Sequence, residues 1–171
     1  MLESRPPLRL PARVLPELVQ RCDRVGRDAL GALRATGRVA GAELAEELAD
    51  SVPPDAAGRR EYWEALELSI GDMGFGSVTY EVLTPGVASV TLPGLPEADR
   101  EDGSPGCPFT TGLLAGLLGH AAGETVAVLE VECRVGGHPA CRFLVGPEPR
   151  LRTIRERLVG GRDLSEALEG L

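Results

Sequence analysis

The sequence predicts an α+β fold, in which helices pack against an antiparallel sheet made of two hairpins. Two observations predict it. The N-terminal part carries three successive stretches with apolar residues at helical spacing. Further along, two pairs of strand-like segments are each joined by a turn rich in proline or glycine, and an apolar helix separates the pairs. At 171 residues, the chain is most simply one domain, residues 1–171.

The first half of the chain is predicted to hold three helices and a hairpin. Residues 11–35 carry an apolar stripe at Val14, Leu18, Cys22, Val25, Ala29 and Leu33. Residues 36–52 form a second helix opened by Thr36, and Gly37 and Gly41 share a face that suits close helix packing. Residues 58–73 form a third helix. A hairpin follows, with strands at 77–83 and 87–92 around a type II turn at Thr84-Pro85-Gly86.

The second half is predicted to repeat the helix-then-hairpin order. Residues 93–106, rich in proline, glycine and acid, should form an exposed, mobile loop. A helix at 109–122 precedes strands at 126–134 and 141–145, which turn about Gly136 and Gly137. The last segment, 151–171, should form one or two short helices split at Gly160 and Gly161. We interpret its arginines as a solvated face: Arg150, Arg152, Arg155, Arg157 and Arg162.

Composition excludes several functions. The net charge of -8 argues against direct binding of nucleic acid, whose phosphates are held mainly by clustered cations. The basic residues are all arginine, so Schiff-base chemistry and lysine-dependent phosphate loops are excluded. The sequence has neither a dinucleotide fingerprint nor a nucleophile elbow. It shows no apolar run suited to a signal peptide or a membrane span, and we therefore expect a cytoplasmic protein.

Large aromatic side chains are scarce, since aromatic residues make up only 4% of the chain. Those present could line an apolar ligand pocket or simply fill the core. The candidates for the pocket are Trp63, Phe75, Tyr80 and Phe109.

Three of the four cysteines and both histidines fall within residues 107–143. In a reducing compartment this clustering favours a metal site over a disulfide, although a Cys133–Cys141 bridge remains an alternative, as do three unrelated buried thiols. Zinc prefers four ligands from thiolate, imidazole and carboxylate. Cys107, Cys133 and Cys141 supply three. The fourth could be Glu130, Glu132, His138 or His120.

The spacing of these residues favours His138, which lies in the predicted turn between two ligands. A regular strand would place Glu130 and Cys133 on opposite faces, so a Glu130 ligand needs a bulge or a strand that ends near Cys133. Cys22 lies on the helical stripe instead, and we expect it to be a buried packing residue.

The patterns CPFTTGLLAGLL, from Cys107, and EVECRVGGHPACRF, from Glu130, resemble the 4-vinyl reductase domain, a family of predicted small-molecule or hydrocarbon-binding modules. The strongest motif covers residues 107–145, and GRVAGAELA and YWEAL with GFG upstream are similar more loosely. The resemblance implies an α+β fold shared with small TRAPP-complex subunits and related to the haem nitric-oxide sensor.

The resemblance also implies a ligand set for the metal. In the sensor domains of phenol-type transcriptional activators, zinc is held by Cys, Glu, Cys and Cys in that order. The matching residues here are Cys107, Glu130, Cys133 and Cys141, so the resemblance favours Glu130 as the fourth ligand and leaves His138 as the fallback. Those activators have a pocket histidine upstream of the first zinc cysteine, whereas no histidine precedes His120 here.

The leading functional prediction is a sensor or carrier that binds a small apolar, aromatic or hydrocarbon ligand beside a structural zinc, acting through a protein partner or as a homodimer. One alternative is a 4-vinyl reductase or accessory protein of (bacterio)chlorophyll biosynthesis. Against it stand the missing nicotinamide and flavin fingerprints and a closed zinc shell. A second alternative is a TRAPP-like structural interaction subunit. We therefore expect a binding domain and not an enzyme.

Overall fold

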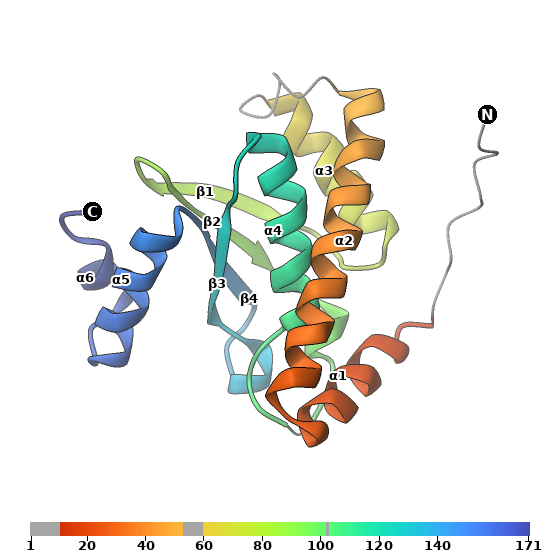
Figure 1. The fold of residues 1–171 in the computed structure, drawn as a ribbon, viewed down its shortest axis with the longest axis horizontal. Helices are drawn as coiled ribbons and strands as arrows, with labels where there is room; N and C mark the ends of the chain where they lie inside the picture. The colour runs from red at the N-terminus through yellow and green to blue at the C-terminus, as the bar shows by residue number, and fades with distance from the viewer. Residues whose placement is uncertain (1–10, 53–59, 102) are drawn as a thin grey trace.

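A computed structural model describes residues 11–52, 60–101 and 103–171 of the chain and shows helices on both faces of a four-stranded antiparallel sheet (Figure 1). The predicted α+β class is confirmed. The helices are α1 (Val14–Val25), α2 (Arg27–Ser51), α3 (Arg60–Asp72), α4 (Pro108–Ala122), α5 (Glu148–Val159) and α6 (Leu164–Leu168), with short 3₁₀ turns η2 (Pro96–Ala98) and η3 (Arg134–Gly136). No helix in the described ranges is long and apolar enough to cross a membrane.

Both predicted hairpins form and join into one sheet. The strands are β1 (Thr79–Thr84), β2 (Val87–Leu92), β3 (Ala127–Glu132) and β4 (Cys141–Gly146), in the order β1-β2-β4-β3. At the first turn, Gly86 has a φ of 84°, as a type II turn requires. The central strands β2 and β4 pair antiparallel, with Val90 opposite Phe143, so the second hairpin continues the sheet begun by the first.

The sheet separates two apolar cores. Helices α1 to α4 lie on one side and α5 with α6 on the other (Figure 1). Successive side chains of a strand point to opposite faces, so Phe143 enters the larger core while Leu144 enters the smaller one. Both side chains are fully buried. Two covered faces therefore explain why β4 is apolar with little alternation, whereas the edge strand β1 is mostly exposed.

The first helical boundary differs from the predicted one. The chain breaks at Gly26, whose φ of 119° is rarely adopted by residues with a side chain. Thr36, predicted to open the second helix, lies inside α2, where its hydroxyl donates a hydrogen bond to the Ala32 carbonyl. The predicted end of α2 at the prolines 53 and 54, and the predicted start of α3 at Gly58, lie outside the described residues.

The predicted apolar stripe of the first helix is wrong in part. Val14, Leu18 and Val25 are 39%, 43% and 79% exposed, while Val19 is buried in their place. The stripe assumed one continuous helix, and the break at Gly26 turns α1 away from the axis of α2 (Figure 1). A single stripe therefore cannot describe the buried faces of both helices.

Residues 93–106 were predicted to be an exposed loop, but their middle is buried. Leu95, Glu97 and Ala98 are at most 5% exposed. Glu97 accepts hydrogen bonds from the backbone amides of Phe109 and Thr110, each at 2.8 Å, and from the Thr110 hydroxyl at 2.6 Å. The carboxylate thus satisfies free amides at the start of α4, and an acidic residue that looked like a solubilising group anchors the loop.

We expect Glu97→Gln to lower the free energy of unfolding by about 2 kcal/mol, because an amide presents donors to a site that contains only donors. Thr110→Val, which removes the hydroxyl and keeps both backbone bonds to Glu97, should cost less, about 1 kcal/mol. Urea denaturation of the two variants would measure the difference. Equal losses would contradict the role given to the carboxylate.

Close packing of α2 against α4 depends on glycines in both helices. A Cβ atom at Gly41 would lie 2.0 Å from the Leu113 carbonyl oxygen, and one at Gly116 would lie 2.1 Å from that of Arg38. Gly37 and Gly112 make equivalent approaches at 2.1 and 2.0 Å. The predicted packing role of Gly37 and Gly41 is confirmed, and the contact is reciprocal between the helices.

Candidate metal centre and adjoining cavity

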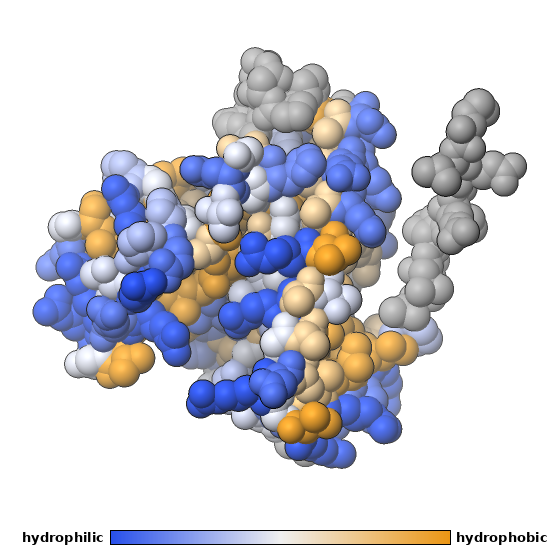
Figure 2. Space-filling model, in the orientation of Figure 1, coloured by the Kyte–Doolittle hydropathy of each residue, from blue (hydrophilic) through white to orange (hydrophobic). Residues whose placement is uncertain are grey.

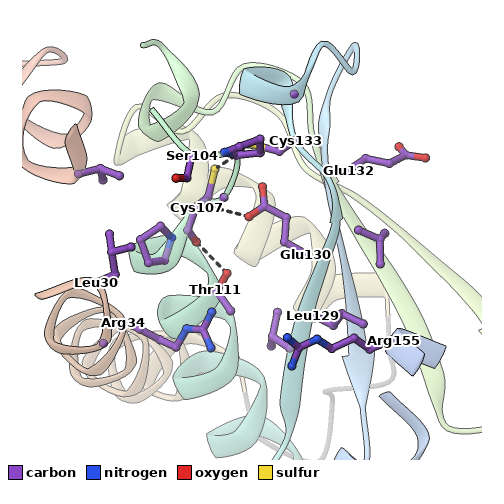
Figure 3. A pocket seen from close by; sticks show the side chains of 18 of the residues that line it. Leu30, Arg34, Ser104, Cys107, Thr111, Leu129, Glu130, Glu132, Cys133 and Arg155 are labelled. Atoms are coloured by element: carbon purple, nitrogen blue, oxygen red, sulfur yellow. Dashed lines mark hydrogen bonds between the residues drawn. The ribbon is translucent and has the colours of Figure 1, made fainter. Parts of the chain in front are cut away.

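Four side chains meet where α4 begins and the β3–β4 hairpin turns. The Cys107 sulfur lies 3.9 Å from that of Cys133 and 3.8 Å from that of Cys141. One ligand atom from each of these cysteines and from Glu130 falls within 4.8 Å of the others. Figure 3 shows Cys107, Glu130 and Cys133 pointing toward one another. The cluster could hold a metal ion, and its thiols are too far apart to be disulfide-bonded.

The start of α4 places Cys107. This residue is the N-cap of the helix, Pro108 takes the first helical position, and the Thr111 hydroxyl donates to the Cys107 carbonyl at 2.7 Å. Just upstream, the guanidinium of Arg100 donates to the carbonyls of Ser104 and Gly106. The loop and the helix therefore both hold Cys107 in position, with 1% of its surface exposed.

A strand irregularity places the second pair of ligands. In the β3–β4 ladder, Glu130 lies opposite Phe143 and Glu132 opposite Arg142, so the register shifts between the two glutamates. The strand then ends, and Cys133 follows directly. The bulge and strand end that a Glu130 ligand requires are thus both present, and they bring the two side chains to one side of the sheet.

Hydrogen bonding leaves part of the cluster unsatisfied. The Cys107 amide donates to Glu130 Oε2 at 2.5 Å, whereas Glu130 Oε1 is buried without a hydrogen-bond partner among the described residues. The Arg134 amide lies 3.5 Å from the Cys141 sulfur and donates to it. A buried carboxylate oxygen without a partner is costly, and a cation at the centre of the cluster would supply one.

The four acidic groups cannot all ionise without such a cation. Burial raises the pKa of Glu130 to about 8, and the neighbouring Cys133 adds to the rise. Hydrogen bonds from Cys107 and Cys141 lower the pKa of Cys133, and the same bond to Cys133 raises the pKa of Cys107. One sulfur carries negative charge at the expense of its neighbours, and a divalent cation would favour the ionised form of all four groups.

The other candidate ligands lie apart from this cluster. His138 is exposed in the turn after η3, and His120 is exposed in the last turn of α4. Glu132 points away from Cys107 (Figure 3). Cys22 is half-buried in α1, less covered than predicted. The four atoms brought together are therefore those that the family resemblance indicated, and the turn position of His138 does not bring it into the group.

A cavity of about 960 Å³ adjoins the cluster. Cys107, Glu130 and Cys133 form part of its wall. Apolar residues of β3 form another part, including Ala127 and Leu129. In Figure 2 an apolar strip over β3 lies between hydrophilic side chains on the α2 side and on the α5 side. The cluster is thus at the border of a space large enough for a small organic molecule.

The four aromatic candidates form two separate pairs. Trp63 stacks on Tyr80 with ring centroids 3.8 Å apart, and both line a smaller cavity of about 420 Å³. Phe75 and Phe109 meet edge to face at 6.5 Å within the larger core, where Phe75 is buried. Neither pair lines the larger cavity. Assignment of these four residues to a ligand site stays a prediction.

Arginines on the wall of the larger cavity were not singled out by the sequence. Arg34 lies in α2, whose exposed face carries other charged residues, and Arg155 belongs to the patch that we interpreted as solvated. Their side chains enter the same space from helices that lie far apart in sequence. No local pattern signals such a meeting.

The fold and the site together define an α+β domain with a buried Cys₃Glu cluster beside a cavity. Residues 90–147, from within β2 to the residue before α5, match the family model of the vinyl-4-reductase domain. This match confirms the resemblance stated from the sequence, over the segment that carries all four cluster residues. No curated protein matches the chain.

Three solved structures share the fold. The phenol-responsive sensory domain of the transcription activator PoxR, solved with phenol, is 23% identical with a TM-score of 0.64, and the alignment covers 86% of this chain and 79% of that one. A trafficking protein particle complex subunit 3 from Naegleria fowleri, covalently bound to palmitic acid, gives 16% identity, a TM-score of 0.60 and coverages of 79% and 91%. A vinyl-4-reductase family protein from Methanocaldococcus jannaschii gives 22%, 0.54, 84% and 83%. The predicted likeness to TRAPP subunits is confirmed.

Proposed function

We propose that residues 1–171 form one ligand-binding domain, a sensor or carrier that holds a small apolar or aromatic molecule beside a structural zinc ion. The observation that carries the proposal is the shared wall, because Cys107, Glu130 and Cys133 belong both to the cluster and to the 960 Å³ cavity. The fold likeness to a phenol-responsive sensory domain supports a small-molecule ligand. A ligand beside a rigid metal site could alter how the domain meets a partner.

Zinc is the metal that best fits the donors. Zinc–sulfur bonds of about 2.3 Å place two thiolates of a tetrahedron about 3.8 Å apart, and the measured sulfur separations are 3.8 and 3.9 Å. Cys107, Glu130, Cys133 and Cys141 would complete a four-ligand shell, and Glu130 Oε1 would gain the partner that it lacks. Such a closed shell is typical of a structural role. Reduced thiols of this kind suit the cytoplasmic location that we expect.

The proposal is tested by native mass spectrometry of the protein purified anaerobically from its own host, combined with elemental analysis. We expect one zinc ion per chain and a small apolar or aromatic ligand. Protein without metal would refute the zinc site. A stable protein complex without ligand would favour an interaction subunit, and steady consumption of NADPH with divinyl chlorophyllide would favour a reductase.

The fourth ligand can be tested by itself. Glu130→Gln should weaken zinc binding by more than about 100-fold, since even residues that only support a zinc ligand contribute about 10- to 100-fold. His138→Ala should leave zinc affinity unchanged because His138 is exposed outside the cluster. Competition with a chromogenic chelator measures both affinities. The reverse ranking would return the fourth position to His138.

A further inference from the structure

The larger cavity has arginines on two sides. Arg34 reaches in from α2 and Arg155 from α5, and both side chains project into the space between α4 and β3 (Figure 3). Arg27 lies two helical turns before Arg34 on the same face of α2 and lines the same cavity. Positive charge therefore borders the apolar surface of β3 on both sides.

These guanidinium groups have no ionic partner within the described parts of the chain, where the ion pairs involve other arginines. The nearby acids are engaged elsewhere. Asp23 accepts a hydrogen bond from the Ser104 amide at 2.9 Å, and Glu148 pairs with Arg152 at 2.5 Å. Glu130 is directed into the thiol cluster. The cavity thus holds positive charge that no described side chain balances.

The apolar surface lies between these charges. Leu129 and Ala127 of β3 and Leu30 of α2 line the cavity and are only partly covered by the protein. A molecule with an apolar body could bury this surface, and burial of apolar area is favourable by about 25 cal/mol per Å². A purely apolar molecule would leave the two guanidinium groups without an acceptor, and a small inorganic anion would leave β3 uncovered.

We propose that the cavity takes a small organic carboxylate, with its apolar body against β3 and its carboxylate between Arg34 and Arg155. This inference rests on the proposed function and names the class of ligand. A guanidinium is planar and binds a carboxylate through two parallel hydrogen bonds. The chain as a whole carries a net charge of -8, which repels anions. Retention of a carboxylate therefore requires this local arrangement and does not follow from general attraction.

The test compares octanoate, ionised at neutral pH, with octanol, which has the same carbon chain without the charge. Isothermal titration calorimetry should show octanoate binding at least about tenfold more tightly, because hydrogen bonds to charged groups are the stronger ones. In the double variant Arg34→Gln/Arg155→Gln this preference should disappear while the affinity for octanol stays the same. Acetate, which lacks the apolar body, should not bind measurably.

A matched control is Arg24→Gln/Arg162→Gln, which removes the same charge from two exposed arginines outside both cavities. It should keep the preference for octanoate, and thermal melting would verify that both double variants are folded. Equal affinity for octanoate and octanol in the unaltered chain, or a preference that survives in Arg34→Gln/Arg155→Gln, would overturn the inference and leave an apolar-ligand domain standing. Binding of neither probe would count against the cavity as a ligand site and so against both proposals.

Discussion

Cys133→Ser is expected to lower the free energy of unfolding by more than about 4 kcal/mol, the range in which loss of a metal site falls. Structural zinc in small domains contributes about 10–16 kcal/mol of apparent binding free energy, and this energy is available only to the folded chain. A serine hydroxyl is a poor replacement for a thiolate. The variant also leaves Cys107, Glu130 and Cys141 buried with incomplete coordination.

Cys22→Ser provides the matched control, because Cys22 is a half-buried cysteine of α1 outside the cluster. It should change stability by at most about 1 kcal/mol. Thermal melting with and without a strong chelator separates the two variants. The chelator should destabilise the unaltered chain and Cys22→Ser by similar amounts and have little further effect on Cys133→Ser. Equal losses for the two serine variants would contradict the division of the cysteines.

Gly41→Ala is expected to cost about 3 kcal/mol, the upper part of the range for added bulk in a packed core. The new methyl group would lie 2.0 Å from the Leu113 carbonyl oxygen, which belongs to the backbone of α4 and cannot rotate away. The two helices must then separate along their contact. Their other glycine approaches would lengthen with it, so one methyl group weakens the whole contact.

Gly31→Ala supplies the control within the same helix. A Cβ atom there meets nothing within 4 Å, and alanine is favoured over glycine in a helix by about 1 kcal/mol. This variant should therefore be slightly stabilised. Urea denaturation at constant m-value would report both changes. Similar free energies for Gly41→Ala and Gly31→Ala would show that helix propensity, and not close packing, determines the effect.

Local chemistry made the second half of the fold predictable. Turns such as Thr84-Pro85-Gly86 restrict the backbone by themselves, and strand alternation identified both hairpins. For the metal cluster, strand geometry could state the condition under which Glu130 joins Cys133, namely a bulge or a strand end. It could not place that bulge, because a register shift depends on how β4 pairs with β3. The family resemblance supplied the choice between Glu130 and His138.

Long-range packing determined what the sequence could not predict. The burial of Glu97 depends on amides at the start of α4, beyond the loop that carries it. The break at Gly26 instead of Thr36 reflects a contact with α4, since the glycines beyond Thr36 are needed inside a continuous α2. The pairing of Arg34 with Arg155 around one cavity likewise arises only once α2 and α5 border β3.

The smaller core has a practical consequence for where the protein can be cut. The segment that matches the vinyl-4-reductase domain ends at residue 147, before α5 and α6. Those helices cover Val87 and Leu144 with Leu151, Ile154 and Ala167. A fragment trimmed to the matched segment would expose that side of the sheet to solvent, and an uncovered apolar sheet face promotes self-association. We expect such a fragment to precipitate unless the last two helices are retained.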